Sequence, residues 1–212
     1  GSGAVVVMRS SSVWTDLRVR RGGDRPGQPL EQRGPRARDR EAVAGPVVAA
    51  AVILPPHTQL DGVRDSKQLR PEVREKLAEQ IRAQALAIGI GMCTPEEIDR
   101  LNILNAALEA MRRAVANLEL TPDYLLVDGN RCFSDPPCPA EPIVKGDQQS
   151  LLIAAASIIA KTTRDALMQR LHEEFPVYGW DRNVGYPTRA HYEALARYGP
   201  SPYHRRSFRL SR

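Results

Sequence analysis

Asp128 closes a short apolar stretch and stands directly before a turn at Gly129 and Asn130. The apolar residues 125–127 predict a buried strand that ends at this acid. Turn formation alone explains an Asp-Gly pair. A carboxylate at the carboxyl end of a central strand can also hold a metal ion or a substrate. Asp128 is therefore a candidate ligand, with a simple turn as the alternative interpretation.

A second candidate acid, Asp165, follows a run of small apolar residues at 153–160. Lys161 and Asp165 are four residues apart, so they share one face of a helix. A surface ion pair is one interpretation, worth at most a few tenths of a kcal/mol. The other is an acid that meets Asp128, since two neighbouring carboxylates repel each other without a cation between them. Oxygen ligands of this kind suit Mg²⁺ or Mn²⁺.

Three short polar pieces have the composition of phosphate contacts. Ser66 and Lys67 lie in a loop before a predicted helix, and Lys145 lies in a similar loop before another. Tyr186 stands between a glycine and a proline that starts a helix. Loop lysines, loop serines and helix starts are common sources of phosphate ligands.

The carboxyl end, Tyr203–Arg212, interleaves basic residues such as Arg205 and Arg206 with aromatic residues. This pattern is typical of a nucleic-acid surface, although a solvated tail explains it equally well. The net charge of +5 and the pI of about 9.4 permit a polyanionic partner.

The elements that must position these side chains alternate between strands and helices. Residues 1–41, rich in Arg, Gly, Pro and Ser, predict a poorly ordered or degenerate segment with one strand near 13–19. The ordered domain is expected at 42–212. Its predicted strands are 46–54, 87–93 and 124–128; its predicted helices are 71–86, one starting at the capping box 94–97, 102–118, 150–175 and 187–198. This order predicts an α/β fold with a helical carboxyl-terminal portion.

The composition excludes several classes of protein. A length of 212 residues and an apolar content of 42% fit one large domain. No apolar run is long enough to span a membrane, and we expect no secretory signal. Three cysteines do not make a disulfide framework, and Cys132 and Cys138 lack a second Cys/His pair for zinc. We expect a cytoplasmic monomer with no membrane partner. An unrelated nucleotide-binding α/β protein is disfavoured because no glycine-rich phosphate loop occurs.

Several of these pieces together resemble the ribonuclease HII family, from about Ala44 to Phe208. The matching segments, in chain order, are Ala44–Leu54, Asp65–Leu69, Glu97–Asp99 with Asn102 and Ile103, Val127–Gly129, Lys145–Asp147, Ala154–Ile158, Ala160 and Lys161 with Thr163–Asp165, Gly185–Thr188 and His204–Phe208. The resemblance implies a ribonuclease H-like fold, with a central mixed β-sheet flanked by helices and a helical carboxyl-terminal region.

The resemblance also implies an activity. Family members cleave the RNA strand of RNA–DNA hybrids and incise at single ribonucleotides in duplex DNA, by two-metal phosphodiester hydrolysis with four carboxylates and Mg²⁺ or Mn²⁺. By motif match, Asp128 and Asp165 are two of these four. Tyr186 matches the tyrosine that stacks at the junction between ribonucleotide and deoxyribonucleotide, and Lys67 matches a phosphate-contacting lysine.

The sequence departs from the family at the motif Asp-Glu-Ala-Gly-Arg-Gly, which supplies the other two acids. Without gaps this motif falls on residues 36–41, where only Arg40 matches. Asp39 and Glu41 replace the two glycines, whose backbone amides recognise the ribose 2′-hydroxyl in the family. They are candidate replacement acids for catalysis and metal binding; alternatively, the segment before Ala42 is non-native. Two hypotheses remain: a metal-dependent endoribonuclease, and a hybrid-binding pseudoenzyme with an incomplete metal site.

Overall fold

Strands and helices alternate along most of the computed structural model, which describes residues 4–9, 41–63 and 69–211. Of residues 4–9 only the backbone is considered. The described strands are β1 (Ala4–Arg9), β2 (Val47–Ile53), β3 (Ala87–Cys93), β4 (Tyr124–Asp128) and β5 (Ala140–Ile143). The described helices are α1 (Pro71–Gln84), α2 (Pro95–Leu101), α3 (Ile103–Ala116), α4 (Gly146–Gln149), α5 (Leu151–Glu174), α6 (Trp180–Asn183) and α7 (Arg189–Tyr198), with a 3₁₀ turn at Pro176–Tyr178.

The described strands form one mixed sheet in the order β3-β2-β1-β4-β5. β1 runs antiparallel to β2 and parallel to β4, so it lies in the middle of the sheet. The β1–β4 pairing ends with Val7 beside Val127. Met8 and Arg9 therefore follow where β4 ends at Asp128.

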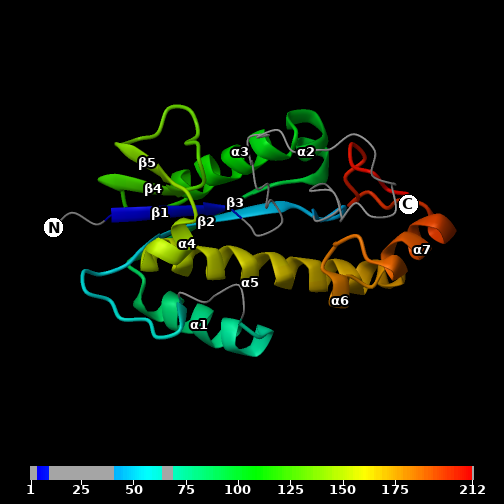
Figure 1. The fold of residues 1–212 in the computed structure, drawn as a ribbon, viewed down its shortest axis with the longest axis horizontal. Helices are drawn as coiled ribbons and strands as arrows, with labels where there is room; N and C mark the ends of the chain where they lie inside the picture. Colours follow the sequence, from blue (N-terminus) through cyan, green and yellow to red (C-terminus); the bar gives the residue numbers. More distant parts are fainter. Residues whose placement is uncertain (1–3, 10–40, 64–68, 212) are drawn as a thin grey trace, which may run out of the picture.

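Helices cover both faces of the sheet, with α2 and α3 on one side and α1 and α5 on the other (Figure 1). The strand β2, next to β1, is buried along its whole length, and successive side chains point to opposite faces. Ala49 and Ala51 thus join the core beneath α3, while Ala50 and Val52 join the core beneath α1 and α5. The small, apolar strand lets the long helix α5 pack closely along the sheet.

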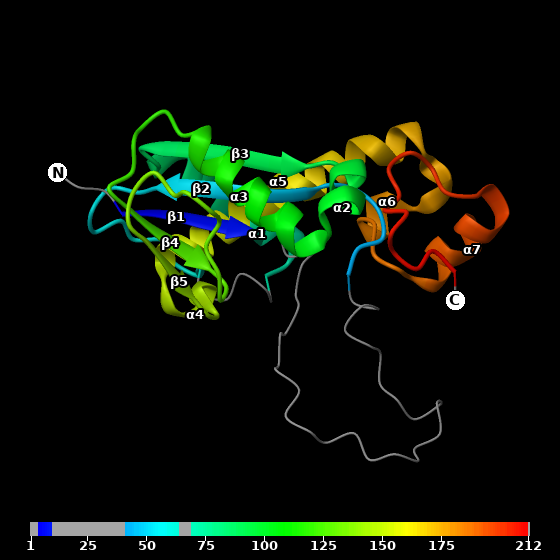
Figure 2. The ribbon, with the colours of Figure 1, turned by 90° about the horizontal axis from the view of Figure 1, so that it is seen from above.

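A separate cluster holds the helical carboxyl-terminal part to the end of α5. α5 extends beyond the sheet, and α6, α7 and the carboxyl end gather around its far half (Figures 1 and 2). Met168 of α5 packs there with Ala44, Tyr178, Trp180 and Leu195. Ala44 brings the chain just before β2 into this cluster, so the sheet and the carboxyl-terminal part meet at residues 42–46.

The α/β fold with a helical carboxyl-terminal region is confirmed. The strand expected near 13–19 lies outside the described residues. A strand forms at Ala4–Arg9, within the amino-terminal segment 1–41. The exact boundary of the amino-terminal segment stays a prediction. In the described part of the chain, none of the helices is long and apolar enough to cross a membrane.

Candidate active site

Asp128 lies at the carboxyl end of β4, as the sequence predicted. Leu125 and Val127 anchor the strand in the core, while the Asp128 side chain is partly exposed. One oxygen of Asp128, Oδ1, accepts a hydrogen bond from the Gly146 amide at 3.0 Å. An amide donor stabilises the ionised carboxylate, which is the form that a cation requires.

The start of α4, which contacts Asp128, needs a glycine at position 146. A Cβ atom built on Gly146 would lie 2.3 Å from Cδ1 of Ile153 and 3.4 Å from Oδ1 of Asp128. The neighbouring residue, Lys145, has a left-handed backbone with φ of 57° and is exposed. This geometry places a cationic side chain on the loop that contacts Asp128.

Asp165 lies on α5 and is paired with two cations. Its Oδ1 accepts a hydrogen bond from Nζ of Lys161 at 2.5 Å, and its Oδ2 lies 3.7 Å from Nη1 of Arg74. Burial lowers the pKa of Lys161, and the charge of Asp165 opposes this shift. The ion pair with Arg74 links α1 to α5, and Arg74 also donates to the backbone oxygen of Leu69, just before α1. The sequence did not identify Arg74 as a site residue, because it lies among other charged residues of α1.

The described carboxylates supply only part of a site for the divalent metal that the resemblance implies. Within residues 41–63 and 69–211, no group of three or more His, Cys, Asp or Glu side chains could hold a metal ion. The strand beside β4 also brings no acid, since β1 reads Ala-Val-Val-Val-Met-Arg. Asp128 and Asp165 also do not meet, contrary to the interpretation from the sequence. Asp128 contacts Gly146, which packs against Ile153, whereas Asp165 lies twelve residues beyond Ile153, about 18 Å further along α5.

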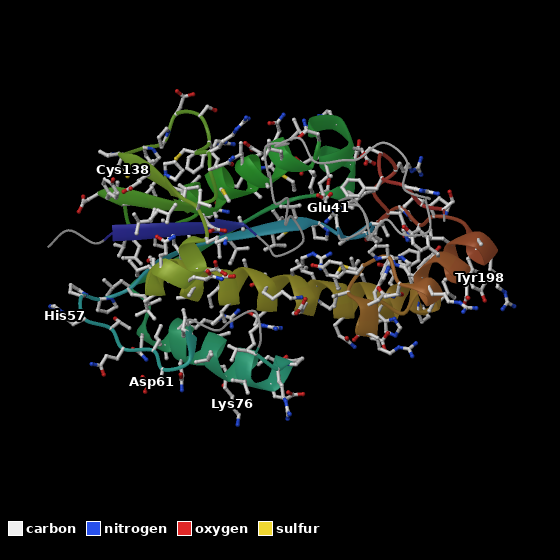
Figure 3. All side chains as sticks on the ribbon, in the orientation of Figure 1. Glu41, His57, Asp61, Lys76, Cys138 and Tyr198 are labelled. Carbon is white, nitrogen blue, oxygen red and sulfur yellow. The ribbon has the colours of Figure 1, made fainter. Side chains whose placement is uncertain are left out.

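Glu41, one of the two candidate replacement acids, is buried with only 5% of its surface exposed. Burial lowers the pKa of Arg205 to about 9, and the charge of Glu41 opposes this shift, so the two groups lie close enough to interact. Figure 3 shows Glu41 near the start of β2, toward the carboxyl-terminal helices. A carboxylate buried beside a guanidinium is better placed as a counter-charge than as an exposed metal ligand. Asp39, the other candidate, lies outside the described residues.

Arg205 does not line the surface, contrary to the sequence prediction. It is fully buried, and its guanidinium donates to the backbone oxygens of Ala42, Gly45 and Pro46. These donors are engaged inside the protein, so the structure does not support the predicted phosphate contact. Two adjacent arginines, Arg205 and Arg206, predict solvent-exposed side chains. Arg205 is buried instead, because the buried carbonyl groups of residues 42–46 need hydrogen-bond donors.

A second buried arginine, which the sequence analysis did not select, completes this arrangement. Arg164 donates to the backbone oxygens of Ala44, Pro46 and Val184 at 2.9–3.1 Å. Burial lowers its pKa. Arg164 directly precedes Asp165 on α5. Its side chain therefore joins the helix, next to the candidate acid, to residues 44–46 and to Val184.

Tyr186 lies two residues after Val184 and is partly exposed. The preceding Gly185 accepts hydrogen bonds from the amides of Val43 and Ala44, and a Cβ atom on Gly185 would lie 2.5 Å from the Ala44 oxygen. The ring of Tyr186 has its centroid 6.0 Å from Cζ of Arg164. The structure thus brings Tyr186 against the segment before β2.

The remaining predicted contacts divide into two groups. Arg206 is exposed, and its amide donates to Oδ2 of Asp99, which fixes the backbone of the carboxyl end against α2. Arg40, Ser66 and Lys67 lie outside the described residues, and their roles stay predictions.

Comparison with known proteins gives a consistent match. The family model described as Ribonuclease HII matches residues 40–211. The chain is similar to a protein named Ribonuclease HII from Salinibacter ruber, with 53% identity over 176 residues, which cover 82% of this chain and 88% of that relative. The matched family range contains Asp128, Asp165 and Tyr186 and begins at Arg40, after Asp39.

Solved structures share the fold. The ribonuclease H2 from Pyrococcus horikoshii OT3 has a TM-score of 0.67 and 27% identity, covering 80% of this chain and 90% of that chain. Bst-RNase HIII in complex with Mn²⁺ has a TM-score of 0.63 at 18% identity, covering 99% of this chain and 68% of that chain. The second likeness concerns the fold alone.

Proposed function

The chain belongs to the ribonuclease HII family, and on this premise we propose that it is an endoribonuclease acting on RNA–DNA hybrids and on ribonucleotides embedded in duplex DNA. The observation that carries the proposal is the family match over residues 40–211, which includes both described acids and Tyr186. The reaction is hydrolysis of a phosphodiester bond. A divalent ion, Mg²⁺ or Mn²⁺, supplies positive charge for the attacking and leaving oxygens when it is bound.

In this proposal the residues of the chain divide the work between metal and duplex. Asp128 and Asp165 are both metal ligands in this proposal, at positions too far apart to share one ion, and the Gly146 amide donates a hydrogen bond to Oδ1 of Asp128. Lys145, exposed on the loop beside Asp128, contacts a phosphate of the duplex. Tyr186 stacks at the ribonucleotide.

A hybrid-binding protein with little cleavage activity is the second candidate, because residues 36–41 keep only Arg40 of the family motif that supplies two acids. β1 carries no carboxylate beside Asp128, and the described residues hold no cluster of three metal ligands. Tyr186 and Lys145, which would contact the duplex, are present in either case. The two candidates therefore share binding and differ in cleavage.

The test measures cleavage and binding of a duplex that contains one ribonucleotide, with Mg²⁺, with Mn²⁺ and without divalent ions. The variants are Asp128→Asn and Asp165→Asn, and the matched control is Asp123→Asn, an exposed acid before the opposite end of β4. We expect both site variants to lose more than about 100-fold in cleavage, because even residues that only support metal ligands change activity by 10–100-fold. The control should keep full activity.

Two results would change this assignment. Cleavage that survives both site variants would refute the roles given to the two acids. A protein that binds the ribonucleotide-containing duplex more tightly than all-DNA duplex, yet does not cleave it with either ion, would favour the second candidate.

A further inference from the structure

Two buried histidines lie behind the Tyr186 loop and are joined to it by hydrogen bonds. Nδ1 of His191 lies 2.9 Å from the backbone oxygen of Tyr186. Nε2 of His191 lies 3.0 Å from Nε2 of His204 and accepts the indole N–H of Trp180 at 3.2 Å. Nδ1 of His204 lies 2.9 Å from both the amide and the hydroxyl of Ser201. His191 and His204 are 0% and 1% exposed.

The neighbours of these rings fix where each proton sits. A backbone amide and an indole N–H can only donate, so Nδ1 of His204 and Nε2 of His191 must be acceptors. His204 then carries its proton on Nε2 and donates to His191. His191 carries its proton on Nδ1 and donates to the oxygen of Tyr186. With both rings neutral, this arrangement gives each of these N–H groups an acceptor, and Nε2 of His191 and Nδ1 of His204 each accept two donors at one lone pair.

The backbone held by this chain is strained. Val184, two residues before Tyr186, has φ of 42°, which is unfavourable for a β-branched residue. Such a conformation persists only where the surroundings determine it. Arg164 holds the Val184 oxygen, and His191 holds the Tyr186 oxygen, which also accepts the Thr188 amide. The Tyr186 ring itself stays partly exposed.

We propose that His191 is a positioning residue for Tyr186, set in the required tautomer by His204 and Ser201, and that this hydrogen-bonded chain orients the Tyr186 ring for a ribonucleotide-containing duplex. The substrate part of this inference rests on the proposed function. The positioning part rests only on the geometry of the loop and the two rings.

The first measurement concerns the unmodified protein. Nitrogen chemical shifts of the imidazole rings report which nitrogen of each histidine carries the proton. We expect Nδ1–H for His191 and Nε2–H for His204. The opposite tautomers, or a charged ring at neutral pH, would overturn the proposal without the need for any variant.

The second measurement is hydrogen exchange of the amides of Tyr186 and Thr188 in two variants. His191→Leu removes the donor to the Tyr186 oxygen, whereas His191→Asn keeps an N–H near the position of Nδ1. We expect exchange about five- to tenfold faster in His191→Leu, consistent with the loss of one hydrogen bond, and a change within about twofold in His191→Asn. Unchanged exchange in His191→Leu would refute the positioning role.

The third measurement is a double-mutant cycle on binding. Its readout is the ratio of Kd values for an all-DNA duplex and the same duplex with one ribonucleotide, measured without cleavage. We expect His191→Leu to lower this ratio as Tyr186→Ala does, and to have no further effect in the Tyr186→Ala background. General destabilisation would weaken binding to both duplexes and leave the ratio unchanged.

The three measurements test the positioning of Tyr186 separately from its role in substrate binding. An unaltered ratio in His191→Leu, in a protein that prefers the ribonucleotide, would overturn the role in substrate orientation. If the unmodified protein shows no preference between the duplexes, the proposed function fails. The tautomers and the exchange rates then still decide whether His191 holds Tyr186.

Discussion

Acid should destabilise the protein through His204, and the structure gives the range and size of the effect. Burial lowers the pKa of His204 from 6.5 to about 4. As the pH falls, the unfolded chain takes up this proton near pH 6.5, whereas the folded protein takes it up only near pH 4. Between these values the unfolded state binds more protons, so stability is present above pH 6.5 and is lost as the pH falls.

The magnitude follows from the difference in pKa. The full effect of 6.5 − 4 = 2.5 pKa units corresponds to about 3 kcal/mol. Because the loss is gradual, about 2 kcal/mol of it should appear between pH 7 and pH 5. This size is plausible for a ring that is only 1% exposed and whose Nδ1 faces the amide donor of Ser201.

The assay compares urea unfolding of the protein and of His204→Asn at several pH values from 7 to 4.5. Asparagine keeps an oxygen that can accept the Ser201 amide, but it does not titrate. Carboxylates that titrate in this range are present in both proteins and largely cancel. The stability advantage of His204 over the variant should shrink by about 2 kcal/mol from pH 7 to pH 5. An advantage that stays constant with pH would refute the reasoning.

Three further predictions concern the loops around the candidate acids. Arg164→Met should destabilise the protein by about 3 kcal/mol in urea unfolding, because three carbonyl groups each lose a donor worth about 1 kcal/mol. Gly146→Ala should cost about 1–3 kcal/mol by forcing its new Cβ against Ile153, and clearly less in an Ile153→Val background, which lacks the clashing Cδ1; equal costs in both backgrounds would contradict the clash. Lys145→Ala should reduce the slope of log Kd against log salt by about 1 for a ribonucleotide-containing duplex, whereas Lys76→Ala, on the outer side of α1 in Figure 3, should leave the slope unchanged.

The elements with strong local signals could be predicted from the sequence. The capping box at Thr94 forms as expected, and the strands at 87–93 and 124–128 have the predicted bounds. β5 was missed because it is an edge strand of the sequence Ala-Glu-Pro-Ile, with neither alternation nor an apolar run. β1 was missed because Val5–Val7 is a short apolar run whose partners, β2 and β4, are distant in the sequence.

The candidate site shows the same division between local and distant signals. Asp128 at a strand end was predictable because the strand and the turn are adjacent in the sequence. The burial of Arg205 was not, because its acceptors at residues 42–46 are about 160 residues away along the chain. The pairing of Arg74 with Asp165 likewise depends on two helices meeting in space.

The position of β1 has a practical consequence for shortened versions of this protein. The family match begins at residue 40, which makes residues 40–211 an obvious fragment to produce. That fragment would lack the strand between β2 and β4, and each of them would expose a row of unpaired backbone groups in the middle of the sheet. Such a fragment should aggregate or fold poorly. A synthetic peptide with the sequence of residues 4–9 fills the same place, so adding it in trans offers a route to rescue.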